Sequence, residues 1–169
     1  MAWLLIPAAI SISACTGEDA QHEGRPVTAL PTPTPTTAFT DFDGFAGEYA
    51  SAAERLAASL PAGVEFPAAP PGEWDTDGTF EDGTGEVAAA LQWRCKWSSA
   101  YVAAADSGLN EDAAAALDQL AEWGTLSEVR KHSDSETRTM WLERVVETAR
   151  SGDDRTLRAI HGECEPGPQ

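Results

Sequence analysis

The sequence has little positive charge. Its 169 residues include 11 Lys and Arg against 28 Asp and Glu, which gives a formal net charge of −17 at pH 7. Proteins that bind nucleic acids neutralise phosphates with basic side chains, and electrostatic adhesion to anionic lipid needs such side chains too. The composition therefore predicts no nucleic-acid partner and no membrane binding through surface charge. Solubility through self-repulsion is the simplest explanation of the acidity.

Histidine is also scarce, which limits acid–base catalysis. The three histidines, His22, His132 and His161, are widely separated in the chain, and the sequence contains no Gly-x-Ser-x-Gly, His-Glu-x-x-His or P-loop motif. Paired carboxylates are common. In so acidic a chain their pairing carries no information, because most of them belong to the surface. We therefore predict no catalytic residue and no cofactor.

The apolar run at the start of the sequence is short. Residues 1–14 carry no charged side chain and end in small residues. A mature transmembrane helix takes about 20 apolar residues, so this run is too short to span a bilayer. It fits the hydrophobic region of an export signal, although no Lys or Arg precedes it. We therefore expect residues 1–14 to be a signal peptide.

The end of this run carries a motif. Ile12-Ser13-Ala14-Cys15 resembles the lipobox of bacterial lipoproteins, in which an aliphatic residue and two small residues precede an obligatory cysteine. The resemblance implies lipid attachment to the Cys15 sulfur and cleavage before Cys15. It also implies a membrane partner through this anchor, and a place at the outer face of the bacterial cytoplasmic membrane. The alternative is an ordinary thiol that follows a chance apolar start.

Residues 15–38 read as a linker. They are polar and rich in Pro and Thr. Alternating Pro favours extended polyproline II at about 3.1 Å per residue, so the segment reaches on the order of 70 Å and acts as a semi-rigid spacer. After it we expect one helical domain, 39–165, and a disordered tail, 166–169.

Cys95 and Cys164 remain as an even pair if Cys15 carries lipid. Cysteines of exported domains pair as disulfides, so we predict a bond between Cys95 and Cys164. The alternative is a metal site that also uses His161 and His132. Zinc sites usually have closely spaced ligand pairs, and here only His161 and Cys164 are close in sequence.

Hydrophobic residues recur at helical spacing through most of the domain. We predict helices over residues 45–59, 86–106, 110–123, 133–150 and 153–162, with a short helix or turn at 126–132. The fold class is therefore all-α: a single compact domain of about four to five helices, stapled by one disulfide. The helix over 133–150 should turn Trp141, Leu142 and Val145 inward. Between the first two helices, the Pro/Gly-rich stretch 61–85 should form one long loop that its aromatic residues pin across the helices.

The helix over Glu86–Asp106 carries an unusual charge. Its apolar positions cover well over half of its circumference, which predicts neighbours on at least two sides, and Thr84 is the expected N-cap. Arg94 points into this apolar arc. An unpaired buried guanidinium is destabilising, so Arg94 should meet a carboxylate, reach the surface or bind an anionic ligand. Arg94, Trp93 and Trp97 are the candidate ligand contacts.

The long loop contains a weak candidate for a cation site. Asp75, Asp77 and Glu86 match positions one, three and twelve of a calcium loop. Phe80 replaces the central glycine of such a loop, and Pro70-Pro71 prevents an entering helix. The alternative is a solvated acidic loop, and we predict no metal.

Three stretches, Leu60–Pro67, Trp93–Trp97 and Gly162–Cys164, are similar to small lipoproteins of high-GC Gram-positive bacteria. The resemblance implies an exported helical domain and says nothing of its chemistry. We expect a non-enzymatic, membrane-tethered extracytoplasmic domain that binds a partner, such as an envelope protein. The alternatives are a small-ligand or cation-binding lipoprotein that uses the acidic loop 74–86 and, third, an envelope hydrolase.

Overall fold

A computed structural model describes residues 38–164. The expected signal peptide 1–14, the linker up to residue 37 and the tail 166–169 lie outside the described residues. The described chain is mostly helical, which confirms the all-α class. The helices are α1 (Phe42–Ala57), α2 (Thr84–Asp106), α3 (Asn110–Glu122), α4 (Ser127–His132), α5 (Ser135–Trp141), α6 (Glu147–Arg150) and α7 (Arg155–Cys164), with a 3₁₀ turn η1 (Trp123–Thr125) and a π-helical segment η2 (Leu142–Val146).

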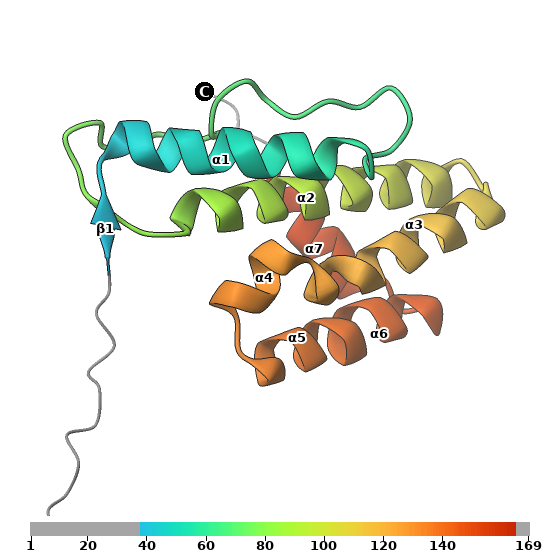
Figure 1. Cartoon of the computed structure of the whole chain (residues 1–169). Coiled ribbons are helices and arrows are strands. Elements are labelled where there is room, and N and C mark those ends of the chain that lie inside the picture. The colour runs from blue at the N-terminus through green and yellow to red at the C-terminus, as the bar shows by residue number, and fades with distance from the viewer. Residues whose placement is uncertain (1–37, 165–169) are drawn as a thin grey trace, which may run out of the picture. The chain divides into compact units, whose positions relative to one another are not determined.

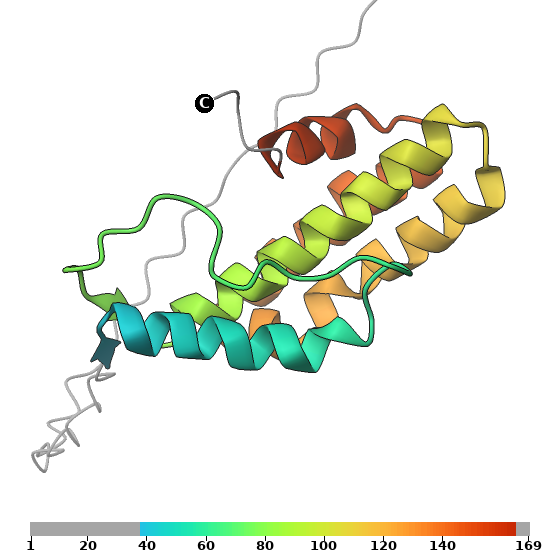
Figure 2. The ribbon, with the colours of Figure 1, turned by 90° about the horizontal axis from the view of Figure 1, so that it is seen from above.

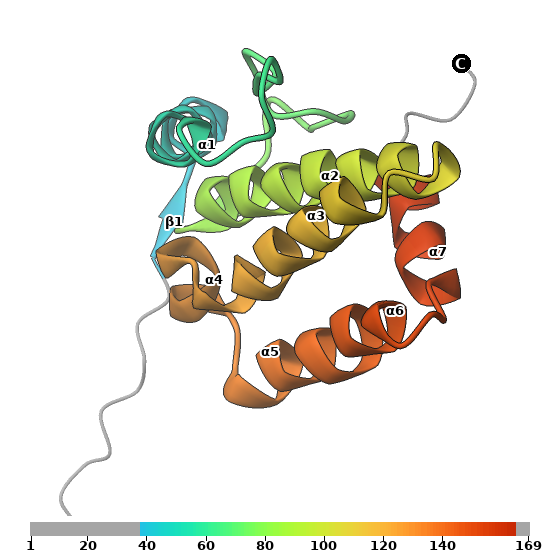
Figure 3. The ribbon, with the colours of Figure 1, turned by 90° about the vertical axis from the view of Figure 1, so that its right-hand side faces the viewer.

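Helix α2 lies at the centre of this domain. It packs against α1, α3, α4 and α7, in agreement with its wide apolar arc. Figure 1 shows α1 on one side of α2, with α3 and α4 on the other side and α5 and α6 beyond them. Helix α7 stands at one edge and bridges α2 to α6 (Figure 3). The core therefore forms around α2, where Ala89, Ala90 and Trp93 are almost fully buried.

Helices α1 and α2 run side by side in the same direction (Figures 1 and 2). A tight turn cannot join such a pair, because the chain must first return along α1, whose 16 residues span about 24 Å. The Pro/Gly-rich loop makes this return. It is pinned as predicted: the rings of Phe66 and Tyr49 meet edge to face at 6.4 Å, and the Tyr49 hydroxyl donates to the carbonyl of Pro67 (3.3 Å). The length of the loop thus follows from the helix direction.

Two short strands mark the starts of these helices. Strand β1 (Phe39–Thr40) precedes α1, and β2 (Phe80–Glu81) precedes α2; the two strands pair antiparallel. Just before β1, the carbonyl of Ala38 accepts a hydrogen bond from the backbone N–H of Asp82 (3.0 Å). The entry to α1 is thereby fastened to the entry to α2.

The first turn of α2 lies directly against α1. A Cβ atom on Gly85 would lie 2.2 Å from the carbonyl oxygen of Phe45, so the approach requires glycine. The Glu48 carboxylate of α1 accepts the backbone N–H groups of Gly83 (3.0 Å) and Gly85 (3.1 Å). The prediction that Thr84 is the N-cap is wrong, since Thr84 is the first helical residue. The cap comes from the neighbouring helix, where no local sequence pattern signals it.

The helix predicted over 133–150 is irregular. The π-helical segment η2 interrupts its α-helical hydrogen bonds between α5 and α6. A π-turn is wider than an α-turn and shifts the residues that follow around the helix. Trp141 and Val145 are buried as predicted, whereas Leu142 is 38% exposed, so the inward placement of Leu142 is wrong.

The predicted disulfide is confirmed. Cys95, in the middle of α2, is bonded to Cys164 at the end of α7, with Cα atoms 5.5 Å apart. The bond ties the last helix to the central one across a sequence separation of 69 residues. It also removes both sulfurs from the alternative metal site with His161 and His132.

Loss of this disulfide should destabilise the domain. Closing a loop of 69 residues contributes roughly 4 kcal/mol in the chain-entropy model. We expect the C95A/C164A variant to lose roughly this free energy of unfolding, measured by tryptophan fluorescence in urea. The native chain with a reductant should show the same shift, and an unchanged midpoint in both samples would contradict the prediction.

Substitution of Gly85 should separate α1 from α2. Gly85→Ala places a methyl group against backbone atoms of α1, and overpacking of this kind costs about 1–3 kcal/mol. Gly47→Ala is the matched control, because Gly47 lies in α1 and a Cβ there would have no neighbour within 4 Å. The control should be neutral or stabilise the helix by up to about 1 kcal/mol. Equal effects on the thermal midpoint would argue against the close approach.

Candidate functional site

Arg94 lies against two tryptophans on the side of α2 that meets η1 and α5. Its guanidinium carbon is 5.2 Å from the ring centroid of Trp123 and 5.2 Å from that of Trp141. The two ring centroids are themselves 5.2 Å apart. A cation within about 6 Å of an aromatic ring is attracted by the ring quadrupole. Three elements thus converge to stabilise one positive charge.

Both tryptophans are held in place by hydrogen bonds. The indole N–H of Trp123 donates to the carbonyl of Ala90 (3.2 Å), and that of Trp141 donates to the carbonyl of Leu120 (2.8 Å). Each residue is 6% exposed. The rings therefore present fixed faces to Arg94.

The guanidinium itself has few polar partners. None of the ion pairs formed by residues 38–164 involves Arg94, and its buried Nε has no hydrogen-bond partner in that range. Burial lowers the pKa of Arg94 below its ordinary value, and the negative charge of Glu163 only partly offsets this effect. An arginine remains protonated at neutral pH even so. Of the three outcomes expected for Arg94, pairing with a carboxylate is not the one observed.

A shallow cavity of about 300 Å³ opens beside this arginine. We name it the Arg94 cavity; besides Arg94, its lining residues are Trp123, Thr137, Met140, Trp141, Arg144 and Val145. Met140 is 45% exposed, and Arg144 is an exposed residue of the π-helical segment η2. Such segments are frequent at functional sites. Two arginines therefore line a cavity whose exposed surface is almost entirely apolar.

Trp93 and Trp97, the other predicted ligand contacts, face the end of α1. The indole N–H of Trp93 donates to Ser59 Oγ (2.9 Å), and that of Trp97 donates to the Ser59 carbonyl (3.0 Å). Trp93 is 1% exposed. Both side chains therefore fasten α2 to the end of α1, and the structure does not bring them into the Arg94 cavity.

The acidic loop does not assemble a cation site. Within residues 38–164 no group of three or more His, Cys, Asp or Glu side chains is placed to hold a metal ion. Asp75 accepts the backbone N–H of Asp77 (3.0 Å), whereas Glu86 lies in α2 and binds Lys131 (3.0 Å). The geometry therefore does not support Asp75, Asp77 and Glu86 as calcium ligands.

Glu86 is the centre of an ion-pair network between helices. Its carboxylate lies 3.3 Å from Arg55 of α1 and 3.0 and 3.3 Å from Lys131 and His132 of α4. Burial raises the pKa of Glu86. The hydrogen bonds from Lys131 and His132 and the charges of Lys131 and Arg55 lower this pKa by more in total, so the net shift is downward. The network fixes α4 to the first two helices.

Glu128 of α4 extends this network into the core. It is 2% exposed and accepts from Arg55 Nε (3.0 Å) and the Ser127 hydroxyl (2.9 Å). Burial raises the pKa of Glu128. Hydrogen bonds from its own backbone N–H, Ser127 and Arg55, together with the Arg55 charge, outweigh burial and leave the pKa below its ordinary value.

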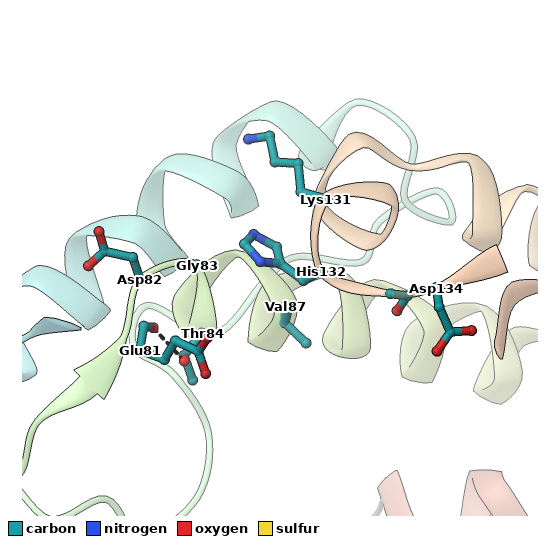
Figure 4. Close-up of a pocket in the computed structure, with 9 residues that line it drawn as sticks. Glu81, Asp82, Gly83, Thr84, Val87, Lys131, His132 and Asp134 are labelled. Atoms are coloured by element: carbon teal, nitrogen blue, oxygen red, sulfur yellow. Dashed lines mark hydrogen bonds between the residues drawn. The ribbon is translucent and has the colours of Figure 1, made fainter. Parts of the chain in front are cut away.

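A cavity of about 640 Å³ lies at the start of α2 (Figure 4). His132 lies over Gly83, where an added Cβ would be 2.0 Å from the imidazole ring. Lys131 and His132 already bind Glu86, and Glu48 already accepts the N–H groups at the helix start. Because the protein uses these charges and donors itself, the cavity does not indicate a ligand.

One serine–histidine contact resembles the pairs that hydrolases use. Ser99 Oγ lies 3.3 Å from His161 Nδ1, and a serine beside a base is the arrangement of nucleophilic catalysis. However, the Ser99 hydroxyl donates to the carbonyl of Cys95 at the shorter distance of 3.0 Å. That bond uses its proton, so the contact joins α7 to α2 and does not activate a nucleophile.

No family model, curated protein or solved structure matches this chain. Cys15, the expected lipidation site, lies outside the described residues. In the part of the chain from Ala38 to Cys164, no helix is both long and apolar enough to cross a membrane. The site must therefore be interpreted from its own residues.

The sequence singled out Arg94 but missed its neighbours in the fold. Trp123, Trp141 and Arg144 lie in other helices, and no spacing rule connects residues across separate elements. The hydrophobic pattern did place Trp141 inward, yet it gave no partner for it. The local signal was a charge within an apolar arc, and it located only one of the residues that form the cavity.

The Glu86 and Glu128 carboxylates should make stability depend on pH. Their native pKa values lie below the ordinary 4.5, so just below that pH the unfolded chain binds more protons. Their contribution is therefore present above pH 4.5 and is lost as the pH falls through the native pKa values. We expect the E86Q/E128Q variant to lose about 2 kcal/mol near neutral pH, from broken charge-assisted hydrogen bonds.

The control for this prediction is Glu54→Gln, since Glu54 is an exposed carboxylate on the same helix as Arg55. Urea unfolding should show a difference between the wild type and E86Q/E128Q that shrinks in acid, while Glu54→Gln tracks the wild type. A difference that stays constant from neutral to acidic pH would show that these carboxylates are not stabilised in their charged form.

Proposed function

We propose that this chain is a lipid-anchored domain at the outer face of a bacterial cytoplasmic membrane, and that it acts by binding. The observation that carries the proposal is the disulfide between Cys95 and Cys164. Disulfides persist in oxidising compartments outside the cytoplasm and are rare inside it. The bond therefore supports export of the domain.

The count of cysteines supports the anchor. The chain has three cysteines, and with two of them bonded to each other Cys15 is the remaining one. It directly follows Ile12-Ser13-Ala14, the residues that resemble a lipobox. A free thiol in an oxidising compartment is open to oxidation and exchange, whereas a thioether to lipid is not. Two acyl chains are enough for stable membrane attachment, and residues 16–38 would then hold the domain away from the bilayer.

A binding role is supported by the described side chains. The Ser99 hydroxyl has its proton committed to a backbone carbonyl, whereas the Arg94 cavity is preformed by two fixed tryptophan rings. Preformed cavities with a few charged groups are typical of binding sites. The partner of such a domain would be another component of the envelope. The cavity also favours a second candidate, a small-ligand-binding lipoprotein that uses Arg94 and not the acidic loop 74–86.

Lipid attachment can be tested directly in bacterial cells. We expect the wild-type chain to incorporate an alkyne-labelled fatty acid and to sediment with membranes, because the Cys15 sulfur carries the lipid. Cys15→Ser should lose both properties. The C95A/C164A variant loses the two other cysteines but keeps Cys15, so it should retain the label. An unlabelled wild type with a free Cys15 thiol would refute the anchor.

A further inference from the structure

We propose that the Arg94 cavity binds an anionic amphiphile, a carboxylate or phosphate group carried on an apolar body. The proposal rests on the binding role inferred above and names its ligand class. It combines three observations: a guanidinium without a carboxylate partner, a second arginine at the same cavity, and an apolar wall between them.

The charge of the cavity favours an anion. Arg55, Arg150 and Arg158 each reach a carboxylate, whereas within residues 38–164 neither Arg94 nor Arg144 forms an ion pair. Lys96, Arg130 and Arg138 form no ion pair there either. Arg94 and Arg144 differ in that both line one cavity that has no acidic residue in its lining, in a chain of net charge −17. A guanidinium presents a planar fork of donors that matches two oxygens of a carboxylate or phosphate.

The burial of Arg94 strengthens this attraction. Its Nε is shielded from solvent and has no hydrogen-bond partner among the described residues, so the protein has already desolvated part of the charge. Electrostatic attraction increases where the local dielectric is low. An anion at the cavity would therefore gain more from Arg94 than from an exposed arginine such as Arg130.

The walls of the cavity favour an apolar body on that anion. Trp141 and Val145 are largely buried, and Met140 is 45% exposed beside them. Methionine adapts its shape to irregular apolar ligands. The volume of about 300 Å³ is at the small end of ligand cavities, which run from about 300 to 1,000 Å³. A short acyl or aromatic group fits this space.

A soluble amphiphile and a lipid headgroup share this chemistry. The strong negative charge of the chain opposes its approach to an anionic bilayer, which favours the soluble source. A cationic amphiphile would be repelled by both arginines. These differences define the probes of the experiment.

The experiment uses the full chain with Cys15→Ser, so that no attached lipid competes for the cavity. Octanoate and octyl phosphate are titrated at constant ionic strength, followed by calorimetry and by tryptophan fluorescence. Acetate and inorganic phosphate lack the apolar body, and octylammonium carries the opposite charge. We expect saturable binding of the two octyl anions that weakens with salt, and little binding of the other probes. Vesicles that contain anionic lipid are the last probe. Binding to the monomeric probes alone assigns a soluble ligand. Binding to vesicles that is lost in Arg94→Met assigns a lipid headgroup.

Variants then connect binding to the cavity. Arg94→Met removes the charge but keeps a flexible side chain against the two tryptophans, and Arg144→Gln changes only an exposed residue. Each should weaken octyl phosphate binding at least about tenfold, because a charge-assisted hydrogen bond is lost. Arg130→Gln removes the same charge from α4, away from the cavity, and should bind as the parent chain does. Circular dichroism and thermal midpoints check the fold, and Arg144→Gln keeps the test valid if Arg94→Met does not fold.

Three results would overturn the proposal. They are no saturable binding of either octyl anion, unchanged binding in both Arg94→Met and Arg144→Gln, or an equal loss in Arg130→Gln. Lipid labelling at Cys15 is measured separately and does not involve the cavity. Failure of ligand binding therefore leaves the anchor untouched, and failure of labelling leaves the ligand result standing.

Discussion

The close approach of the first turn of α2 to α1 sets the orientation of the central helix. Gly85 leaves no room for a side chain against Phe45, and Glu48 accepts N–H groups that a helix start leaves open. With α2 fixed in this way, three consecutive residues reach three different neighbours at about 100° intervals. Trp93 bonds to the end of α1, Arg94 contacts the two tryptophans of η1 and α5, and Cys95 is joined to α7.

Much of this fold could be predicted from the sequence, because its determinants are local. The apolar spacing of 86–106 located α2 and its neighbours on several sides, and the cysteine count located the disulfide. The misses have non-local causes. Thr84 looked like an N-cap because the sequence around it fits one, but a carboxylate from another helix fills that role. Leu142 was placed inward by α-helical periodicity, which the π-helical segment η2 interrupts.

The candidate site was predictable only in part, for the same reason. A charge within an apolar arc is visible in the sequence, so Arg94 could be recognised. Its aromatic partners could not, because Trp123 and Trp141 come from other elements. Trp93 and Trp97 are near Arg94 in sequence, yet their indole N–H groups donate to Ser59 at the end of α1. Sequence neighbours on a helix face different directions, and a cavity between helices is built from residues that local spacing cannot connect.

The hydrogen bond from Asp82 to the carbonyl of Ala38, with the β1–β2 pair beside it, has a mechanical consequence. A pull on the chain ahead of Ala38 acts on the entry to α2 as well as on α1. The pulling force is therefore divided between α1 and α2, which run in the same direction and pack closely at Gly85. The start of α1 would not unravel alone, since the hydrogen bond to Ala38 and the β1–β2 pair would have to break first.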